Sequence, residues 1–264
     1  MTKEKIMNGI ILVCLLSLGF LLGMPSTALA FKVPIHEQIT REVFADFQVV
    51  AGGQTLKFTD YAINQIVNAN KHTDDLPNQA NSEMHFDGED FAGGSKRVMD
   101  LKEKVISKVT TEEPESTSAR NDLGTALHTI QDFYAHSNWV ELGHSSPNIN
   151  RKIGTEIFSG ADKNTPTCPT DPGTLGGAGL SQLTSGYFIL SNQLACGVPQ
   201  GKCRHGVPVV CPDGLNKDDD SRPGFLTARP LAVDATKDYL NQIFSDSRIT
   251  GNINVIKLLM RINN

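Results

Sequence analysis

The chain has 264 residues, 20% of them charged, and a formal net charge of −5 at neutral pH. This acidic balance lacks the basic surface that binds nucleic acid, so it argues against a nucleic-acid partner. The length suits one large domain or two small ones, and no long low-complexity linker argues for two.

Residues 1–30 have the layout of a secretory signal peptide. Lys3 and Lys5 precede an apolar run at residues 10–22, and residues 28–30 (Ala-Leu-Ala) offer a cleavage site. The alternative is an uncleaved membrane anchor, for which the apolar run is short. We therefore predict that the signal is removed and that the protein is secreted or periplasmic.

Two amphipathic helices are predicted at the start of the mature chain. The first covers residues 34–47, with proline in its first turn and His36 beside its buried stripe. That stripe repeats every fourth residue: Ile35, Ile39, Val43 and Phe47. The second covers residues 59–70 and turns Ala62, Ile63, Ile66 and Val67 inward.

The next loop, residues 72–91, is the richest stretch of its length in candidate ligands. They are His72, Asp74, Asp75, His85 and Asp87. The alternative is an ordinary polar loop rich in turn-forming residues. Residues 95–109 then predict an amphipathic helix with lysine and glutamate on its solvent-exposed face.

Residues 123–143 predict one long helix with the clearest sign of a metal site. His128, Asp132 and His136 recur every fourth residue. Each such step advances a helix by about 40° beyond a full turn, so the three side chains form one stripe. If the stripe is buried, an aspartate between two histidines needs a partner, and a metal bound by imidazole and carboxylate supplies one. The alternative is a solvated face with a His–Asp–His hydrogen-bond chain.

The segment ALHTIQDFYAHSNWVEL, residues 126–142, resembles the signature of the Het-C (heterokaryon incompatibility) family and the related von Willebrand factor A domain-containing protein 7. GLNKD at residues 214–218 extends this resemblance, because Het-C type proteins carry a similar GINKD run after an HGG element. The H-x3-D spacing followed by a further histidine is also similar, more distantly, to the metal helix of zinc-dependent phospholipase C and of the single-strand-specific zinc nucleases.

The resemblance implies a metal site built from three segments. HEQIT at residues 36–40 is similar to an element that supplies a histidine ligand, and the loop 72–91 is similar to a segment that supplies one aspartate and one histidine. Asp74 or Asp75 is then the catalytic proton acceptor, whereas Asp87 is expected at the surface. Glu141 and His144 lie just past the helix motif and are expected to add ligands near His136. The expected ligands of one to three zinc ions are His36, Asp75 (or Asp74), His85, His128, Asp132, His136, Glu141 and His144.

Four cysteines follow the signal segment, an even number that fits two disulfides in an exported chain. Three connectivities are possible. Proximity along the chain favours Cys203 with Cys211 and Cys168 with Cys196.

The last third of the chain alternates between irregular and helical predictions. Loops are expected at about residues 148–179 and 196–225, and helices at 180–194 and 226–244. The final helix lacks the histidine that related proteins have near its start, which leaves a complete three-metal site in question. The second loop carries an oxygen-rich run that suits calcium: Asp213, Asn216, Asp218 and Asp220.

No segment alternates apolar and polar residues as a strand does, so we predict an all-α fold with one helical domain over residues 31–264. The central helix should be buried, with metals held between helices, as in other helical bundles. The resemblance implies the fold of zinc-dependent phospholipase C, with long disulfide-bearing loops at one end.

The resemblance implies a secreted metal-dependent hydrolase of phosphoric esters that acts through metal-activated water, like phospholipase C. The net charge becomes −6 once Lys3, Glu4 and Lys5 are removed, so a phospholipid at a membrane surface or a small phosphoester suits the chain better than long nucleic acids. The alternative is a metal-stabilised recognition or interaction protein of the Het-C type, without turnover. An open coordination position and an accessible cleft would separate the two hypotheses, and the oligomeric state is left open.

Overall fold

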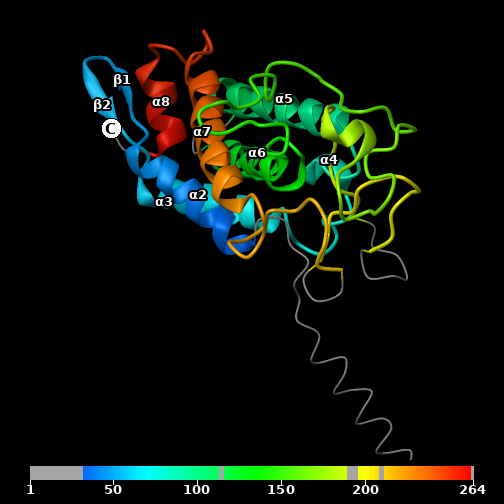
Figure 1. Ribbon diagram of the computed structural model, residues 1–264. Coiled ribbons are helices and arrows are strands. Elements are labelled where there is room, and N and C mark those ends of the chain that lie inside the picture. Colours follow the sequence, from blue (N-terminus) through cyan, green and yellow to red (C-terminus); the bar gives the residue numbers. More distant parts are fainter. Residues whose placement is uncertain (1–31, 113–115, 189–195, 208–210, 263–264) are drawn as a thin grey trace, which may run out of the picture.

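The computed structural model describes residues 32–112, 116–188, 196–207 and 211–262, so the predicted signal peptide lies outside the described part. The described residues are mostly helical (Figure 1). Their α-helices are α2 (Val33–Asp46), α3 (Asp60–His72), α4 (Ser82–His85), α5 (Phe91–Ser107), α6 (Thr117–His136), α7 (Phe225–Phe244) and α8 (Ile253–Met260). A π-helical turn, Lys108–Glu112, follows α5, and a short 3-10 helix covers Gly177–Leu180.

The helices predicted at residues 34–47, 59–70 and 226–244 are confirmed as α2, α3 and α7, whereas α8 was not predicted. In α3, the side chain of Thr59 caps the N-terminus by accepting a hydrogen bond from the Ala62 N–H at 3.2 Å. The helix α5 begins four residues earlier than predicted, because the Asp90 side chain accepts from the Gly93 N–H at 2.9 Å and caps it there. No described helix is long and apolar enough to cross a membrane.

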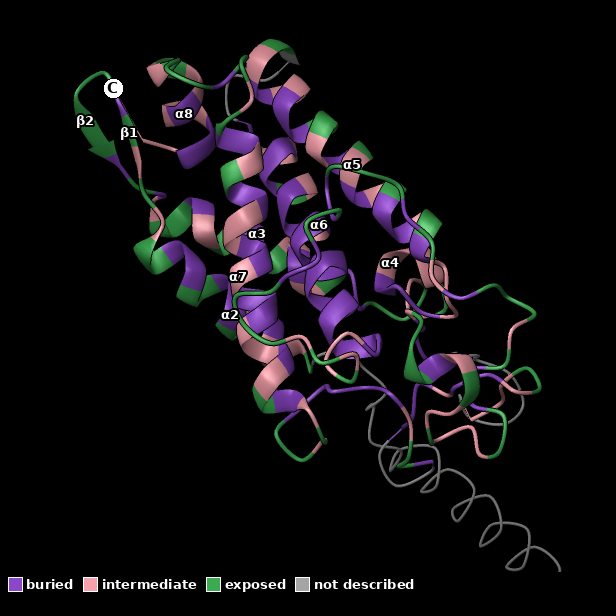
Figure 2. Ribbon diagram, turned by 45° about the horizontal axis from the view of Figure 1, so that its top comes forward, coloured by how far each residue is buried: buried purple, intermediate pink, exposed green. Residues whose placement is uncertain are grey.

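The helix α6 occupies the centre of the molecule. It packs most extensively against α3, α5 and α7, and every residue from Ala126 to His136 is buried (Figure 2). The histidine–aspartate stripe therefore does not face solvent, which removes the solvated-face alternative.

Gly124 sets the distance between α3 and α6. A Cβ atom at this position would lie 2.2 Å from the carbonyl oxygen of Ile66 and 2.8 Å from the Cβ of Ala69. Only glycine permits this approach. The close contact brings Asn70 of α3 to the stripe, where its Oδ1 lies 3.3 Å from the Nδ1 of His128.

The central helix ends earlier than predicted, at His136 rather than Gly143. Ser137 adopts an extended conformation, with φ −90° and ψ 166°. The side chain of Asn138 then makes hydrogen bonds to backbone groups within residues 179–184. The chain leaves the helix because these bonds replace the helical ones.

Two further predictions of secondary structure are wrong in part. Residues 181–188 are irregular rather than helical, and the rest of the predicted helix 180–194 is outside the described residues. The all-α prediction missed an antiparallel hairpin, β1 (Val49–Ala51) and β2 (Gln54–Leu56). Strands of three residues are too short to show alternation. The Gly52-Gly53 turn, with positive φ at both positions, was the available signal.

The favoured disulfide pairing is wrong. The structure pairs Cys168 with Cys203 and Cys196 with Cys211. The Cys168 N–H donates to the carbonyl of Gly201 at 2.9 Å, so the two loops run side by side at this point and backbone pairing, not proximity in sequence, decides the partner.

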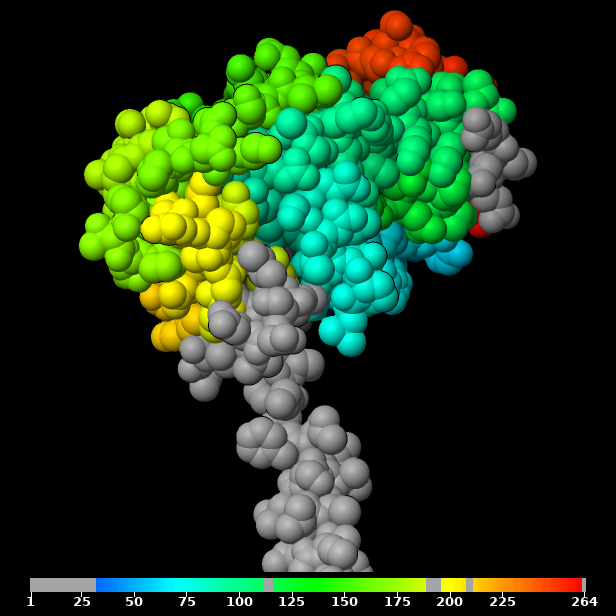
Figure 3. Space-filling model, turned by 90° about the vertical axis from the view of Figure 1, so that its right-hand side faces the viewer, coloured from blue at the N-terminus to red at the C-terminus, as the bar shows by residue number. Residues whose placement is uncertain are grey.

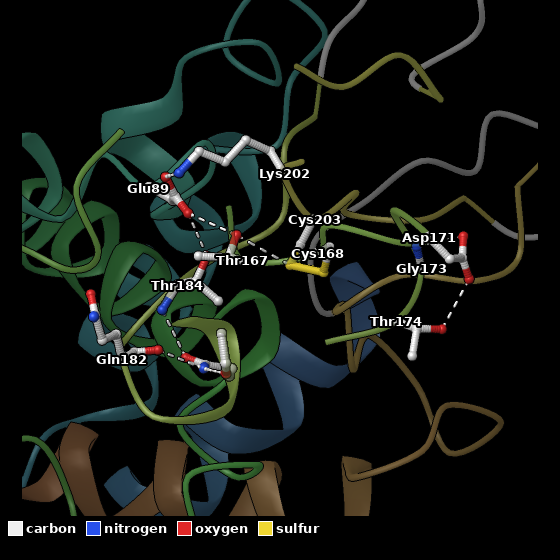
Figure 4. The surroundings of a disulfide bond; sticks show 12 residues. Glu89, Thr167, Cys168, Asp171, Gly173, Thr174, Gln182, Thr184, Lys202 and Cys203 are labelled. Carbon is white, nitrogen blue, oxygen red and sulfur yellow. Dashed lines mark hydrogen bonds and ion pairs between the residues drawn. A yellow bond between two sulfur atoms is a disulfide. The ribbon is translucent and has the colours of Figure 1, made fainter. Parts of the chain in front are cut away.

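The disulfide-bearing loops cover one end of the helical bundle (Figures 1 and 3). A buried ion pair ties them to the helices, because the Nζ of Lys202 lies 2.6 Å from the Oε2 of Glu89 and both side chains are 3% exposed (Figure 4). Glu89 also accepts a hydrogen bond from the Thr184 hydroxyl at 2.6 Å.

Candidate metal centre

Histidine and aspartate side chains from five segments gather around the C-terminal half of α6. Three groups could each hold a metal ion, because the ligand atoms within each group lie within 4.8 Å of one another. The groups are His36, His128 and Asp132; Asp74, His85 and His128; and Asp87, His136 and His205. All of these residues are buried. The cluster therefore combines α2, the loop after α3, α4, α6 and the second disulfide-bearing loop.

Asp132 lies at the middle of the first two groups and is fully buried. Its Oδ2 lies 2.8 Å from the Nδ1 of His85 and 2.9 Å from the Nε2 of His128. Its Oδ1 lies 3.1 Å from the Nε2 of His36. One carboxylate thus faces three imidazoles from three different helices, an arrangement suited to bridging two ions.

His136 organises the third group. Its Nδ1 lies 2.9 Å from the carbonyl oxygen of His85 and 3.1 Å from the Oδ1 of Asp87. These acceptors favour a proton on Nδ1, which leaves the Nε2 lone pair available to a metal. The Oδ1 of Asp218 lies 3.5 Å from that Nε2, and the ring of His205 meets the His136 ring edge-on at 4.4 Å.

Phe86 explains how two neighbouring residues reach the same cluster. It adopts a left-handed conformation with φ 54°, which is rare for a bulky residue and which turns the chain between His85 and Asp87. Its ring is fully buried, and a Cβ at Gly94 would lie 2.6 Å from it. The buried ring anchors the strained turn, so both neighbours point to the cluster.

Burial decides the direction of the pKa shift at Asp74 and His128. It raises the pKa of Asp74 to about 7 against the opposing charge of His36. It lowers the pKa of His128 to about 3, so this imidazole is neutral, the form that binds a metal. Burial alone would raise the pKa of Asp132, but the imidazoles of His128, His136 and His36 outweigh it and hold that pKa well below its usual range.

Three other histidines of the cluster have raised pKa values: His85, His136 and His36, whose pKa Asp132 raises against the effect of burial. Burial acts to lower the pKa of His85 and His136, but nearby carboxylates outweigh it. Asp132 raises the pKa of His85, and Asp87 together with Asp132 raises that of His136 well above its usual value. For His205 burial prevails, and its pKa is lowered.

The donor atoms of the cluster fit a metal. The Oδ2 of Asp74 and the Nε2 atoms of His85 and His136 are buried and make no hydrogen bond to any described residue. Buried polar atoms of proteins almost always have a partner. Imidazole nitrogens and carboxylate oxygens are the ligands that zinc prefers in proteins, so divalent ions bound in the cluster would satisfy the two imidazole nitrogens.

The structure separates the predicted site residues into two sets. It brings together His36, Asp74, His85, His128, Asp132 and His136. Asp75 instead lies at the surface, 61% exposed and 3.1 Å from His72. Glu141 pairs with Lys217 at 3.0 Å, and His144 stacks on Trp139 with ring centroids 3.9 Å apart.

Asp87, His205 and Asp218 belong to the cluster but were absent from the expected zinc ligands. The expectation that Asp87 lies at the surface is wrong, because it is 4% exposed. The available signal for the other two was the family resemblance. His205 begins the pair His205-Gly206, which is similar to the start of the HGG element, and Asp218 ends the GLNKD run at residues 214–218.

The oxygen-rich run proposed for calcium has no common centre in the structure. Asp213 pairs with Arg204 at 2.8 Å, and the amide of Asn216 donates to the carbonyl oxygens of His205 and Gly206. Asp220 is exposed, and Asp218 turns to His136. Calcium at these residues therefore stays a prediction from the sequence alone.

A small cavity borders the third group. Its lining is Asp74, Gln79, His85, Asp87, His136, Phe188 and His205. Its volume of about 10 Å³ leaves room for about one water molecule. The cluster thus has space beside Asp74 and His136 for a single small reactant.

Comparison with known proteins places the chain in a family. Residues 39–251 match the model of the VWA7 N-terminal domain. Von Willebrand factor A domain-containing protein 7 of Rattus norvegicus is 37% identical over 189 residues, and that of Homo sapiens is 35% identical over 188 residues. Each match covers 67% of this chain but only 20% of the relative's length. No solved structure matches the chain.

Proposed function

We propose that this chain, which belongs to the family of the VWA7 N-terminal domain, holds divalent metal ions in the cluster around α6 and hydrolyses phosphoric esters. The observation that carries this proposal is the burial, in one small region, of histidine and aspartate atoms such as Asp74 Oδ2 and His136 Nε2 that have no hydrogen-bond partner among the described residues. Zinc is the proposed metal, with one to three ions, because the ligands are imidazoles and carboxylates.

Different groups of side chains would bind different ions. His36, His128 and Asp132 would hold one ion, and His85, whose Nδ1 lies 2.8 Å from the Oδ2 of Asp132, would help to hold a second. Asp87, His136 and His205 form the third group. Bound ions would supply Lewis acidity, which polarises a phosphoryl oxygen and makes water a better nucleophile near neutral pH.

Asp74 is the proposed proton acceptor. It lines the cavity, its Oδ2 makes no hydrogen bond within the described residues, and burial raises its pKa to about 7. A carboxylate oxygen that borders the cavity without another partner is placed to accept a proton from a water molecule there. Of the two adjacent candidates from the sequence, Asp74 faces the cluster and Asp75 faces solvent.

The proposals for localisation and substrate rest on the disulfides and on the net charge of the chain. The two disulfides fit an oxidising compartment, which supports a secreted or periplasmic protein with the signal peptide at residues 1–30. The acidic chain favours a phospholipid at a membrane surface or a small phosphoester as substrate. We extend the proposal to the fold, which would resemble that of zinc-dependent phospholipase C, because ligands from α2, the loop after α3 and α6 meet in the core.

The size of the cavity favours a second candidate function. About 10 Å³ admits a water but no phosphoester. A metal-stabilised recognition or interaction protein of the Het-C type, without turnover, needs no larger space. The two functions share the metal centre and differ in whether substrate gains access to it.

The experiment is a hydrolysis assay on purified, zinc-supplemented protein with phosphatidylcholine vesicles and bis(p-nitrophenyl) phosphate. Asp74→Asn should lower kcat by roughly 100-fold or more, as loss of a general base does. The same change at the next residue, Asp75→Asn, should leave kcat unaltered. A metal-loaded protein without turnover on either substrate would eliminate the hydrolase and leave the recognition protein.

A further inference from the structure

A second cleft lies beside the metal centre and shares no residue with it. Its volume is about 470 Å³, within the range of small-molecule sites in proteins. One face of α3, from Gln65 to Thr73, forms one side, and Asn121 and Thr125 of α6 form another. Arg97 of α5 completes it.

The cleft and the metal cavity lie on opposite sides of one wall. Thr73, Asn78 and Met84 line the cleft, and the residue that follows each of them lines the metal cavity: Asp74, Gln79 and His85. A ligand in the cleft would therefore approach the metal centre without touching its ligands.

Arg97 gives the cleft its chemical character. Its side chain is only 17% exposed, and its buried Nε makes no hydrogen bond to any described residue. The carboxylate of Glu83, itself 46% exposed, comes no nearer than 3.9 Å, too far for a hydrogen bond. No aspartate or glutamate is among the described residues that line the cleft. Burying the Nε of a guanidinium without a hydrogen-bond partner costs free energy, and an oxyanion in the cleft would supply that partner.

The other lining groups define the rest of the ligand. The amides of Asn68, Asn78 and Asn121 and the hydroxyl of Thr125 offer donors and acceptors to hydroxyl groups. We propose that this cleft binds a small phosphorylated polyol, whose phosphate receives two parallel hydrogen bonds from the guanidinium of Arg97. Guanidinium and phosphate match in geometry as well as charge. This site does not depend on the proposed hydrolysis.

The test is calorimetric titration of the zinc-supplemented full chain with glycerol phosphate and, separately, with glycerol. Glycerol phosphate should bind and glycerol should not. Arg97→Gln should weaken binding roughly tenfold or more, and Arg97→Lys should fall between, because it keeps the charge and loses the planar fork. Arg41→Gln, which removes the same charge from an exposed position, should bind as the unchanged protein does.

Vesicles of phosphatidic acid distinguish the source of the phosphate. Binding of vesicles that depends on Arg97 would identify a lipid headgroup, and binding of soluble glycerol phosphate alone would identify a free metabolite; both support the site. The proposal fails if no phosphorylated probe binds. It also fails if binding survives Arg97→Gln but disappears in Asp132→Asn, because the anion then sits on the metal. Arg97-dependent binding in a protein without hydrolysis would sink the proposed function and leave this site standing.

Discussion

Replacing Asp132 with asparagine preserves the shape of the side chain and removes the charge that three imidazoles face at 2.8, 2.9 and 3.1 Å. Removing one partner of a buried ionic cluster typically costs about 3–5 kcal/mol. A bound ion adds stabilisation that grows with its free concentration, about 4 kcal/mol at a thousand times Kd, and this is lost as well. We therefore expect Asp132→Asn to lower the free energy of unfolding by roughly 5 kcal/mol or more.

The assay is differential scanning calorimetry with and without zinc, together with metal analysis of the same samples. For a chain of this size each kcal/mol shifts Tm by about 2–4 °C, so Tm should fall by roughly 10–20 °C and metal should be absent. Asp122→Asn is the matched control, because it makes the same change on α6 at a partly exposed residue that pairs with Lys108 at 2.7 Å and lies outside the cluster. An Asp132→Asn protein with unchanged metal content and unchanged Tm would refute the reasoning.

Three further outcomes are expected. Gly124→Ala should lower the free energy of unfolding in urea by about 1–3 kcal/mol, because the new methyl group would lie 2.2 Å from the Ile66 carbonyl oxygen. An unchanged midpoint of unfolding would mean that α3 and α6 are farther apart than this contact requires. Metal binding should weaken as pH falls from 8 to 6, because the raised pKa values of His36, His85 and His136 let protons compete for ligands that must bind deprotonated. Calorimetry in buffers of different ionisation enthalpy should detect proton release, and its absence would contradict the ligand set. Peptide mapping without reduction should recover Cys168–Cys203 and Cys196–Cys211, and recovery of Cys203–Cys211 would overturn the path of the loops.

The regular part of the centre could be predicted from the sequence. His128, Asp132 and His136 follow from helical spacing, because a single element carries all three. The family resemblance added His36 and His85, each on or beside a recognisable element.

The irregular part could not. Asp74 and Asp75 are neighbours, and only the turn after α3 decides which one faces inward. His205 and Asp218 lie in a loop without periodicity, held by backbone bonds such as that from the His205 N–H to the Tyr187 carbonyl at 3.0 Å. Such pairings join segments far apart in the chain, so local patterns carry no trace of them.

Metal analysis of the purified chain, expressed with residues 1–30 and kept away from chelators, tests the central claim most directly. At least one tightly bound divalent ion per chain should be found, and X-ray absorption at the metal edge should report a first shell of imidazole nitrogen and carboxylate oxygen at about 2.0–2.2 Å. A correctly folded protein that contains no metal, and whose Tm is the same with and without added zinc, would contradict the account.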